Sequence, residues 1–145
     1  MNCLYLNKDL FRFKLKDNQL CSFCLKDAET IDHIFVKCEF SSNLYSEISS
    51  WLNTHKINLP PLNLTSIVVG PCLCFNFSLL INFILLAYKS YIYRARTKGC
   101  LLSLNGFKVY LSCYVQIEYN IASKNNTMHI HLTKFSNLRD ALVRI

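Results

Sequence analysis

The hydrophobic and polar positions change period along the chain, and the changes predict where its elements lie. Residues 10–16, LFRFKLK, alternate strictly, with Phe11, Phe13 and Leu15 on one face and three basic residues on the other. A period of two is typical of a short half-buried strand or an extended arm. We therefore predict an extended basic arm near the N-terminus.

From residue 41 onward the apolar residues recur three to four positions apart, the period of an amphipathic helix. Ser41 or Ser42 is a suitable N-cap, because a serine hydroxyl can accept a hydrogen bond from a free backbone amide. We take the single tryptophan as a core anchor. The predicted stripe consists of Leu44, Ile48, Trp51 and Leu52.

Two adjacent prolines follow this helix and exclude helix at that point. We predict a linker over residues 56–77, a pair of packed helices over residues 78–126 and a C-terminal tail over residues 127–145. The second helix of the pair is expected over residues 103–123. Its expected core stripe is Leu104, Phe107, Leu111, Tyr114 and Ile121.

Residues 57–88 contain no charged residue, so a membrane span must be considered. A span needs about 20 consecutive apolar residues, whereas a glycine, a proline and two asparagines interrupt this stretch. We therefore expect a buried core helix. Membrane association through residues 64–88 stays an alternative.

The formal net charge of +7 favours a partner with negative charge, nucleic acid above all. Tyrosines interleave with basic residues in YKSYIYRARTK, a pattern typical of binding to phosphates and exposed bases. The same pattern also arises where a core helix emerges into water with cations at its C-terminus, and both interpretations stay open. The candidate contacts to RNA or DNA are Arg12, Lys14, Lys16, Lys37, Lys89, Tyr93, Arg94, Arg96 and Lys98.

The chain has eight cysteines in 145 residues. Residues 1–16 contain no apolar stretch followed by a cleavage site of small residues, so we expect an intracellular protein, nuclear or cytoplasmic and not secreted. In a reducing compartment clustered thiols are more often metal ligands than disulfides.

Four residues, Cys21, Cys24, His33 and Cys38, are spaced as C-x2-C-x8-H-x4-C. Three thiolates and one imidazole are the ligand set of structural zinc, and they leave no position for water. Thr30 can cap a short helical turn that carries the histidine. His33 and Cys38 lie five apart, which is not one helical face, so we expect the turn to unwind before Cys38. Chance in a cysteine-rich chain is the competing explanation.

These patterns together predict a mainly α fold with a small α+β element at the N-terminus. A CCHC zinc knuckle is followed by amphipathic and core helices. Residues 1–55 form the first unit of this prediction, with the basic arm, the knuckle that holds one structural Zn²⁺, and the helix after it.

The segment CSFCLKDAETIDHIFVKC resembles the zinc-binding segment that follows the polymerase region in reverse transcriptases of non-LTR (LINE-type) retrotransposons. The family pattern is C-x2-C, an acidic stretch with Glu-Thr or Glu-Ser, H-[LI]-F-x-x-C, and an aromatic helix ending near Trp-Leu. The resemblance covers most of residues 4–126. The matching residues are Cys21, Cys24, Glu29, Thr30, His33, Ile34, Phe35, Cys38, Trp51 and Leu52.

The resemblance implies a C-terminal piece of a retrotransposon polyprotein that helps to hold template RNA or target DNA. It also implies a reverse transcriptase domain of a related element as a partner, and no small-molecule substrate. The chain lacks the paired aspartates and the length of a polymerase palm, and it lacks the acidic cluster of an endonuclease. We therefore expect a non-catalytic module, with Met1 an internal methionine of a truncated element. A decayed remnant that once packed on the polymerase, with no ligand of its own, is the alternative.

Overall fold

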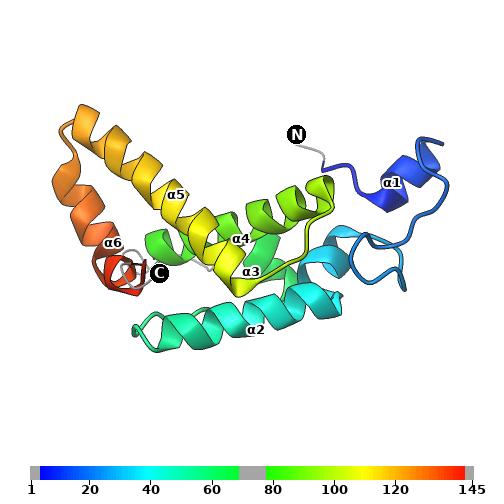
Figure 1. The fold of residues 1–145 in the computed structure, drawn as a ribbon, viewed down its shortest axis with the longest axis horizontal. Helices are drawn as coiled ribbons and strands as arrows, with labels where there is room; N and C mark the ends of the chain where they lie inside the picture. Colours follow the sequence, from blue (N-terminus) through cyan, green and yellow to red (C-terminus); the bar gives the residue numbers. More distant parts are fainter. Residues whose placement is uncertain (1–3, 69–77, 143–145) are drawn as a thin grey trace.

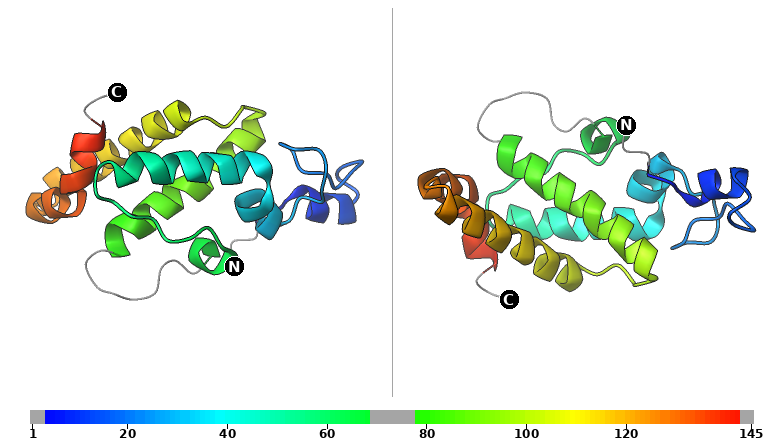
Figure 2. Two further views of the ribbon diagram at one scale, coloured as in Figure 1. Left: turned by 90° about the horizontal axis from the view of Figure 1, so that it is seen from below. Right: turned by 90° about the horizontal axis from the view of Figure 1, so that it is seen from above.

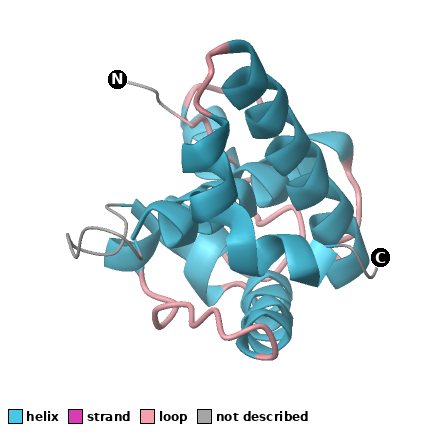
Figure 3. Cartoon of the chain, turned by 90° about the vertical axis from the view of Figure 1, so that its left-hand side faces the viewer, coloured by secondary structure: helices cyan, strands magenta, loops and turns pink. Residues whose placement is uncertain are grey.

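The computed structural model describes residues 4–68 and 78–142, and this part of the chain consists of helices joined by loops (Figures 1 and 3). The mainly α fold is therefore confirmed. Within the described residues the only pairing of extended backbone is a single antiparallel bridge between Leu20 and Ala28. The helices are α1 (Asn7–Arg12), η1 (His33–Lys37), α2 (Glu39–Asn53), α3 (Leu64–Val68), α4 (Ser78–Lys98), α5 (Leu104–Lys124) and α6 (Met128–Leu142).

Helix α4 passes through the middle of the molecule, with α2 and α5 packed along it (Figures 1 and 2). The hairpin of α5 and α6 forms one end, and α1 with the cysteine-bearing loop forms the other. The buried side chains of α4 meet apolar side chains from α2, α5 and α6 in one core. Its fully buried members include Ile48, Leu52, Ile84, Tyr88, Ile92, Phe107, Leu111 and Phe135.

The apolar run of the sequence thus becomes a buried core helix, as predicted. In the described part of the chain, no helix combines the length and the apolar character needed to cross a bilayer.

The prediction of a short strand or extended arm over residues 10–16 is wrong. Residues 7–12 form α1, and the chain then turns, with Lys14 at a φ of 57°. The alternating side chains Phe11, Phe13 and Leu15 are exposed, so an extended conformation would not be stabilised by burial of an apolar face. Among the described residues, a strand here would also have no neighbour for its backbone hydrogen bonds. The turn satisfies them locally, for example from Phe13 N to Asp9 O at 3.0 Å.

Helix α2 is present where the sequence predicted it, but it begins earlier. Cys38 is the residue at its N-terminus, with extended backbone and no side-chain cap. Ser41, one of the two expected caps, is fully buried inside the helix. The reason is that Cys38 must stay extended to reach the cysteine cluster, and the helix starts directly after it.

Helix α5 begins as predicted, with the Ser103 hydroxyl accepting a hydrogen bond from Gly106 N at 3.1 Å. Its expected stripe is only partly buried, because Tyr114 and Ile121 are exposed at the outer surface. Two elements were not expected. Helix α3 lies in the predicted linker, whose residues 69–77 are outside the described part, and α6 replaces the predicted tail.

The buried hydroxyl of Tyr88 links three elements, and its removal is expected to destabilise the fold. It lies 3.0 Å from both the Phe35 and the Ser41 carbonyl oxygens, so α4 is fastened to η1 and α2. Tyr88→Phe should lower the free energy of unfolding by about 1–3 kcal/mol, because the Phe35 and Ser41 carbonyls lose the one buried hydroxyl proton that they share. Chemical denaturation measures this loss. Tyr93→Phe is the control, since the Tyr93 hydroxyl donates no hydrogen bond within the described residues; equal losses in both variants would contradict the account.

Candidate metal centre

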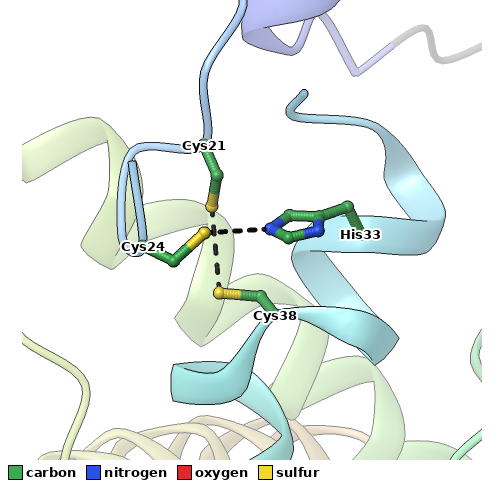
Figure 4. A group of neighbouring side chains, drawn as sticks. All are labelled: Cys21, Cys24, His33 and Cys38. Carbon is green, nitrogen blue, oxygen red and sulfur yellow. Dashed lines mark hydrogen bonds between the residues drawn. The ribbon is translucent and has the colours of Figure 1, made fainter. Parts of the chain in front are cut away.

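The first two cysteines lie on a tight hairpin. Cys21 N donates to Asp27 O at 2.8 Å, and Glu29 N donates to Gln19 O at 2.8 Å, which closes the base of the loop. Leu25 N then donates to Cys21 O at 3.0 Å, and Leu25 adopts a φ of 56°. This turn brings the Cys21 and Cys24 side chains to the same side of the hairpin (Figure 4).

The second pair of ligands lies on a turn of π-helix, η1. Thr30 caps the preceding helical turn as predicted, because its hydroxyl accepts a hydrogen bond from His33 N at 3.1 Å. Cys38 N donates to His33 O at 2.7 Å, a bond that spans five residues. The turn widens into π-helix over His33–Lys37 and ends there, and Cys38 has extended backbone, in agreement with the prediction that the turn unwinds before Cys38.

The four side chains converge at the geometry of a tetrahedral metal site (Figure 4). All four ligand atoms lie within 4.8 Å of one another. Cys21 Sγ and Cys38 Sγ are 3.8 Å apart, and Cys24 Sγ and His33 Nε2 are 3.3 Å apart. A tetrahedral zinc about 2.3 Å from each sulfur and about 2.0 Å from the nitrogen gives about 3.8 Å between sulfurs and about 3.5 Å between sulfur and nitrogen. The residues present therefore fit one structural Zn²⁺.

Burial supports a structural role for the ion. Cys21 and Cys38 are fully buried, His33 nearly so, and only Cys24 is partly exposed. Without metal, the Cys21 thiol donates to the Cys38 sulfur, which lowers the pKa of Cys38 to about 7 and raises that of Cys21. Zinc replaces this shared proton, so its binding releases protons and weakens in acid.

The Asp27 carboxylate lies near His33, at a distance longer than a hydrogen bond. The Nδ1 of His33 lies 3.8 Å from an Asp27 carboxylate oxygen, while its Nε2 faces the sulfurs. Ligating histidines commonly direct their other nitrogen to a carboxylate, which fixes the tautomer. Asp27 had no role in the sequence prediction; its position two residues from the end of the hairpin contains no signal that would have indicated one.

The structure gives Glu29, which matched the family pattern but had no predicted role, a central position beside the site. Its side chain is 0% exposed, although it is a carboxylate. Oε1 accepts hydrogen bonds from Asn7 N at 2.9 Å and from Arg96 Nε at 2.7 Å, and Oε2 accepts one from Ser22 N at 2.7 Å. One carboxylate thus joins α1, the hairpin that holds Cys21, and the C-terminal part of α4.

Asn7 completes this network from the N-terminal helix. Its side-chain amide donates to Leu20 O at 2.6 Å and to Ser22 Oγ at 3.1 Å. Its Oδ1 accepts from Arg96 Nη2 at 2.9 Å and from Lys16 Nζ at 2.8 Å. The buried charges of Glu29 and Arg96 are therefore both paired and hydrogen-bonded, as buried charges in proteins must be.

The carboxyl of Glu29 remains ionised in this setting. Burial alone would raise its pKa, but the hydrogen bonds from Ser22, Asn7 and Arg96 outweigh burial and hold the pKa below its ordinary value. The folded state therefore gains stability above the ordinary glutamate pKa and loses it as the pH falls through the lowered one.

The structure shows which of the candidate nucleic-acid contacts already have a partner within the protein. Arg96 pairs with Glu29, and its side chain is only 9% exposed, so its guanidinium is used within the fold rather than left for phosphate. Lys16 bonds Asn7, Lys37 pairs with Asp32, and Lys89 is partly buried with its pKa lowered by burial. The half-buried ring of Tyr93 contacts the Arg96 guanidinium at 5.5 Å. Among the described residues, the candidates with exposed side chains and no ion pair are Lys14, Arg94 and Lys98, whereas the exposed Arg12 lies 3.8 Å from Asp9.

Residues 1–45 match the protein family described as zinc-binding in reverse transcriptase. The matched segment contains all four ligand residues and ends within α2. The resemblance to a reverse transcriptase zinc-binding region is thereby confirmed for this segment, and the assignment to LINE-type elements stays a prediction. No curated protein and no solved structure matches the chain.

Elemental analysis of the purified chain should give one zinc per molecule. The double variant Cys21→Ser/Cys24→Ser should contain none and lose cooperative unfolding, because binding of structural zinc contributes directly to folding. The matched control is Cys100→Ser/Cys113→Ser, which replaces two exposed cysteines outside the cluster and should keep the metal. Zinc retained without Cys21 and Cys24 would contradict the assigned ligands.

Glu29→Gln should lower the free energy of unfolding by about 1.5–3 kcal/mol, the range for hydrogen bonds to charged groups. Both carboxylate oxygens face N–H donors, so the amide of glutamine must place a donor against a donor. Glu47→Gln is the control, because Glu47 is exposed and has no ion pair among the described residues. The loss of stability caused by Glu29→Gln should be smaller when it is measured in a protein that already carries Arg96→Gln. If the losses of the two single variants simply add in the double variant, the two side chains do not interact.

Proposed function

We propose that the chain is a non-catalytic, zinc-stabilised module that binds nucleic acid. The observation that carries the proposal is the distribution of charge. Residues 1–47 contain six Lys or Arg and seven Asp or Glu, which gives a formal charge of −1. Residues 48–145 contain ten Lys or Arg and two Asp or Glu, which gives a formal charge of +8. Almost all the excess positive charge therefore belongs to the helices rather than to the zinc-binding segment.

Most of the Lys and Arg side chains of the zinc-binding segment contact acidic or polar side chains of the same segment. Lys26 pairs with Glu39 at 2.8 Å, Lys37 with Asp32, and Arg12 lies 3.8 Å from Asp9. Zinc and three thiolates add one further negative charge. The arm that the sequence pattern favoured for binding is thus a weaker candidate than the helical surface.

Zinc has a structural part in this proposal. Four protein ligands fill its tetrahedral shell, so no position is left for the water or substrate that catalytic zinc requires. The ion would hold the hairpin against η1 and, through Glu29 and Arg96, keep the C-terminal end of α4 in place. The family matched by residues 1–45 is the zinc-binding one, which agrees with a module that assists a polymerase rather than acting as one.

A second candidate function is docking onto a larger protein, such as the polymerase part of a reverse transcriptase. Exposed apolar side chains near the N-terminus favour it: Tyr5, Phe11, Phe13 and Leu15 are all about half exposed or more. Such patches commonly mark protein contacts. This candidate predicts concentration-dependent self-association of the isolated chain and no salt-dependent binding to RNA or DNA.

Binding to a fluorescently labelled oligonucleotide should weaken steeply with salt. For a single strand the slope of log K against log salt is about −0.7 per phosphate neutralised. If three phosphates are contacted, affinity should fall about 20-fold between about 50 and 200 mM salt. Fluorescence anisotropy over this range, with zinc content checked in each sample, measures the slope. Absence of binding, or binding that salt does not change, would contradict the proposal and favour the docking function.

A further inference from the structure

Two tyrosines of α5 lie beside the basic end of α4 and form a surface that we call the tyrosine strip, defined as Arg94, Lys98, Tyr110 and Tyr114. Arg94 and Lys98 are one turn apart on α4, so they share a face, and both are exposed. The Arg94 guanidinium lies 5.9 Å from the centre of the Tyr110 ring. Tyr114 is 36% exposed at the outer end of the strip.

The rings of the strip are held in place from the core outward. Phe107 is fully buried, and its ring centre lies 5.8 Å from that of Tyr91. Tyr91 lies 5.5 Å from Tyr110, and Tyr110 lies 4.9 Å from Tyr114. Four aromatic rings therefore run continuously from the interior to the surface, and the exposed ones need little ordering when a ligand binds.

Hydrogen bonds fix the edges of the same rings. Ser90 Oγ and the Tyr110 hydroxyl are 2.6 Å apart, and the Tyr110 hydroxyl donates to the Tyr114 hydroxyl at 3.1 Å. Gly106 makes room for the base of the array, because a Cβ there would lie 2.3 Å from the Tyr91 hydroxyl. The array is thus preorganised by both packing and hydrogen bonding.

The sequence that contains the strip carries charge of one sign, and the acidic residue one turn beyond Tyr114 on α5, Glu118, lies 3.3 Å from Lys134. Between Glu47 and Glu118 there is no acidic residue, whereas the same stretch contains six Lys or Arg. Arg96 is used by Glu29, which leaves Arg94 and Lys98 as the cations of the α4 end that face solvent. A ligand at the strip would therefore meet aromatic faces beside positive charge, which suits a base next to a phosphate.

We propose that the tyrosine strip binds single-stranded nucleic acid, with an unpaired base stacked on Tyr114 and Tyr110 and a neighbouring phosphate on Arg94. This inference rests on the proposed function and specifies its ligand. A duplex keeps its bases stacked on one another, so their faces are not free for tyrosine. Stacking on aromatic side chains is tolerant of sequence, so the strip selects unpaired strands rather than particular bases.

The test uses the full zinc-loaded chain, a labelled single-stranded oligonucleotide of mixed sequence and the duplex of the same sequence. Tyr114→Leu removes the aromatic face and keeps an apolar side chain, while Tyr114→Phe keeps the face and removes the hydroxyl. Stacking is worth enough that Tyr114→Leu should weaken single-strand binding about 5- to 100-fold. Tyr114→Phe should bind within about twofold of the unchanged protein, and duplex binding should be equal in both variants.

Two further variants separate the strip from electrostatics elsewhere. Arg94→Gln should make the salt slope for single strands shallower by about 0.7, the value of one phosphate contact. Lys8→Gln, which replaces an exposed cation of α1 outside the candidate contacts, should leave that slope unchanged. Circular dichroism and zinc content verify that each variant is folded.

The possible failures are distinguishable. If the unchanged protein binds no nucleic acid, or binds it without dependence on salt, the proposed function itself is overturned. If it binds with a steep salt slope but Tyr114→Leu and Arg94→Gln bind as tightly as before, only the tyrosine strip is overturned. Equal losses for single strand and duplex would likewise overturn it, because they would show that the aromatic face contributes no selectivity.

Discussion

The carboxylate of Glu29 is the interaction on which the arrangement of the molecule depends. It lies inside the protein with hydrogen bonds from α1, from the hairpin of the first two cysteines and from Arg96 on α4. A metal site alone would order only the segment that contains its ligands. The ion pair between Glu29 and Arg96 connects that segment to α4, because the two residues are 67 positions apart in the sequence. Removing either partner would leave the other charge buried without compensation, which is costly.

In the proposed function, this coupling explains how a zinc-binding segment without surplus positive charge can belong to a module that binds nucleic acid. The zinc-binding part has a formal charge of −1 and the remaining helices +8. In the proposed function the metal does not contact the ligand. It fixes the hairpin and η1, Glu29 fixes the end of α4, and the exposed face of that helix carries Arg94 and Lys98 beside the tyrosines of α5. The proposed binding surface therefore does not include the zinc ligands, and the buried Glu29–Arg96 ion pair and the Tyr88 hydroxyl both connect α4 to the zinc-binding segment.

Local features of the chain could be predicted from its sequence, and long-range ones could not. The ligand spacing, the Thr30 cap and the buried run of α4 depend on residues close together, so their patterns are visible. The alternation at residues 10–16 misled because period two has meaning only where a neighbouring strand exists. The ligand spacing indicated that the turn ends before Cys38, but it contained no signal for the π-helical form of that turn. The pairing of Glu29 with Arg96 left no trace in either local sequence, and it converted one expected phosphate contact into a structural residue.

X-ray absorption spectroscopy at the zinc edge of the purified chain tests the central claim most directly. A closed site built from Cys21, Cys24, His33 and Cys38 predicts three sulfur neighbours at about 2.3 Å and one nitrogen at about 2.0–2.1 Å, with no further oxygen neighbour. That spectrum should be unchanged when excess oligonucleotide is added, because the ligand is proposed to bind at the helices. A spectrum with fewer than three sulfurs, or with an oxygen in the first shell, would contradict a structural site.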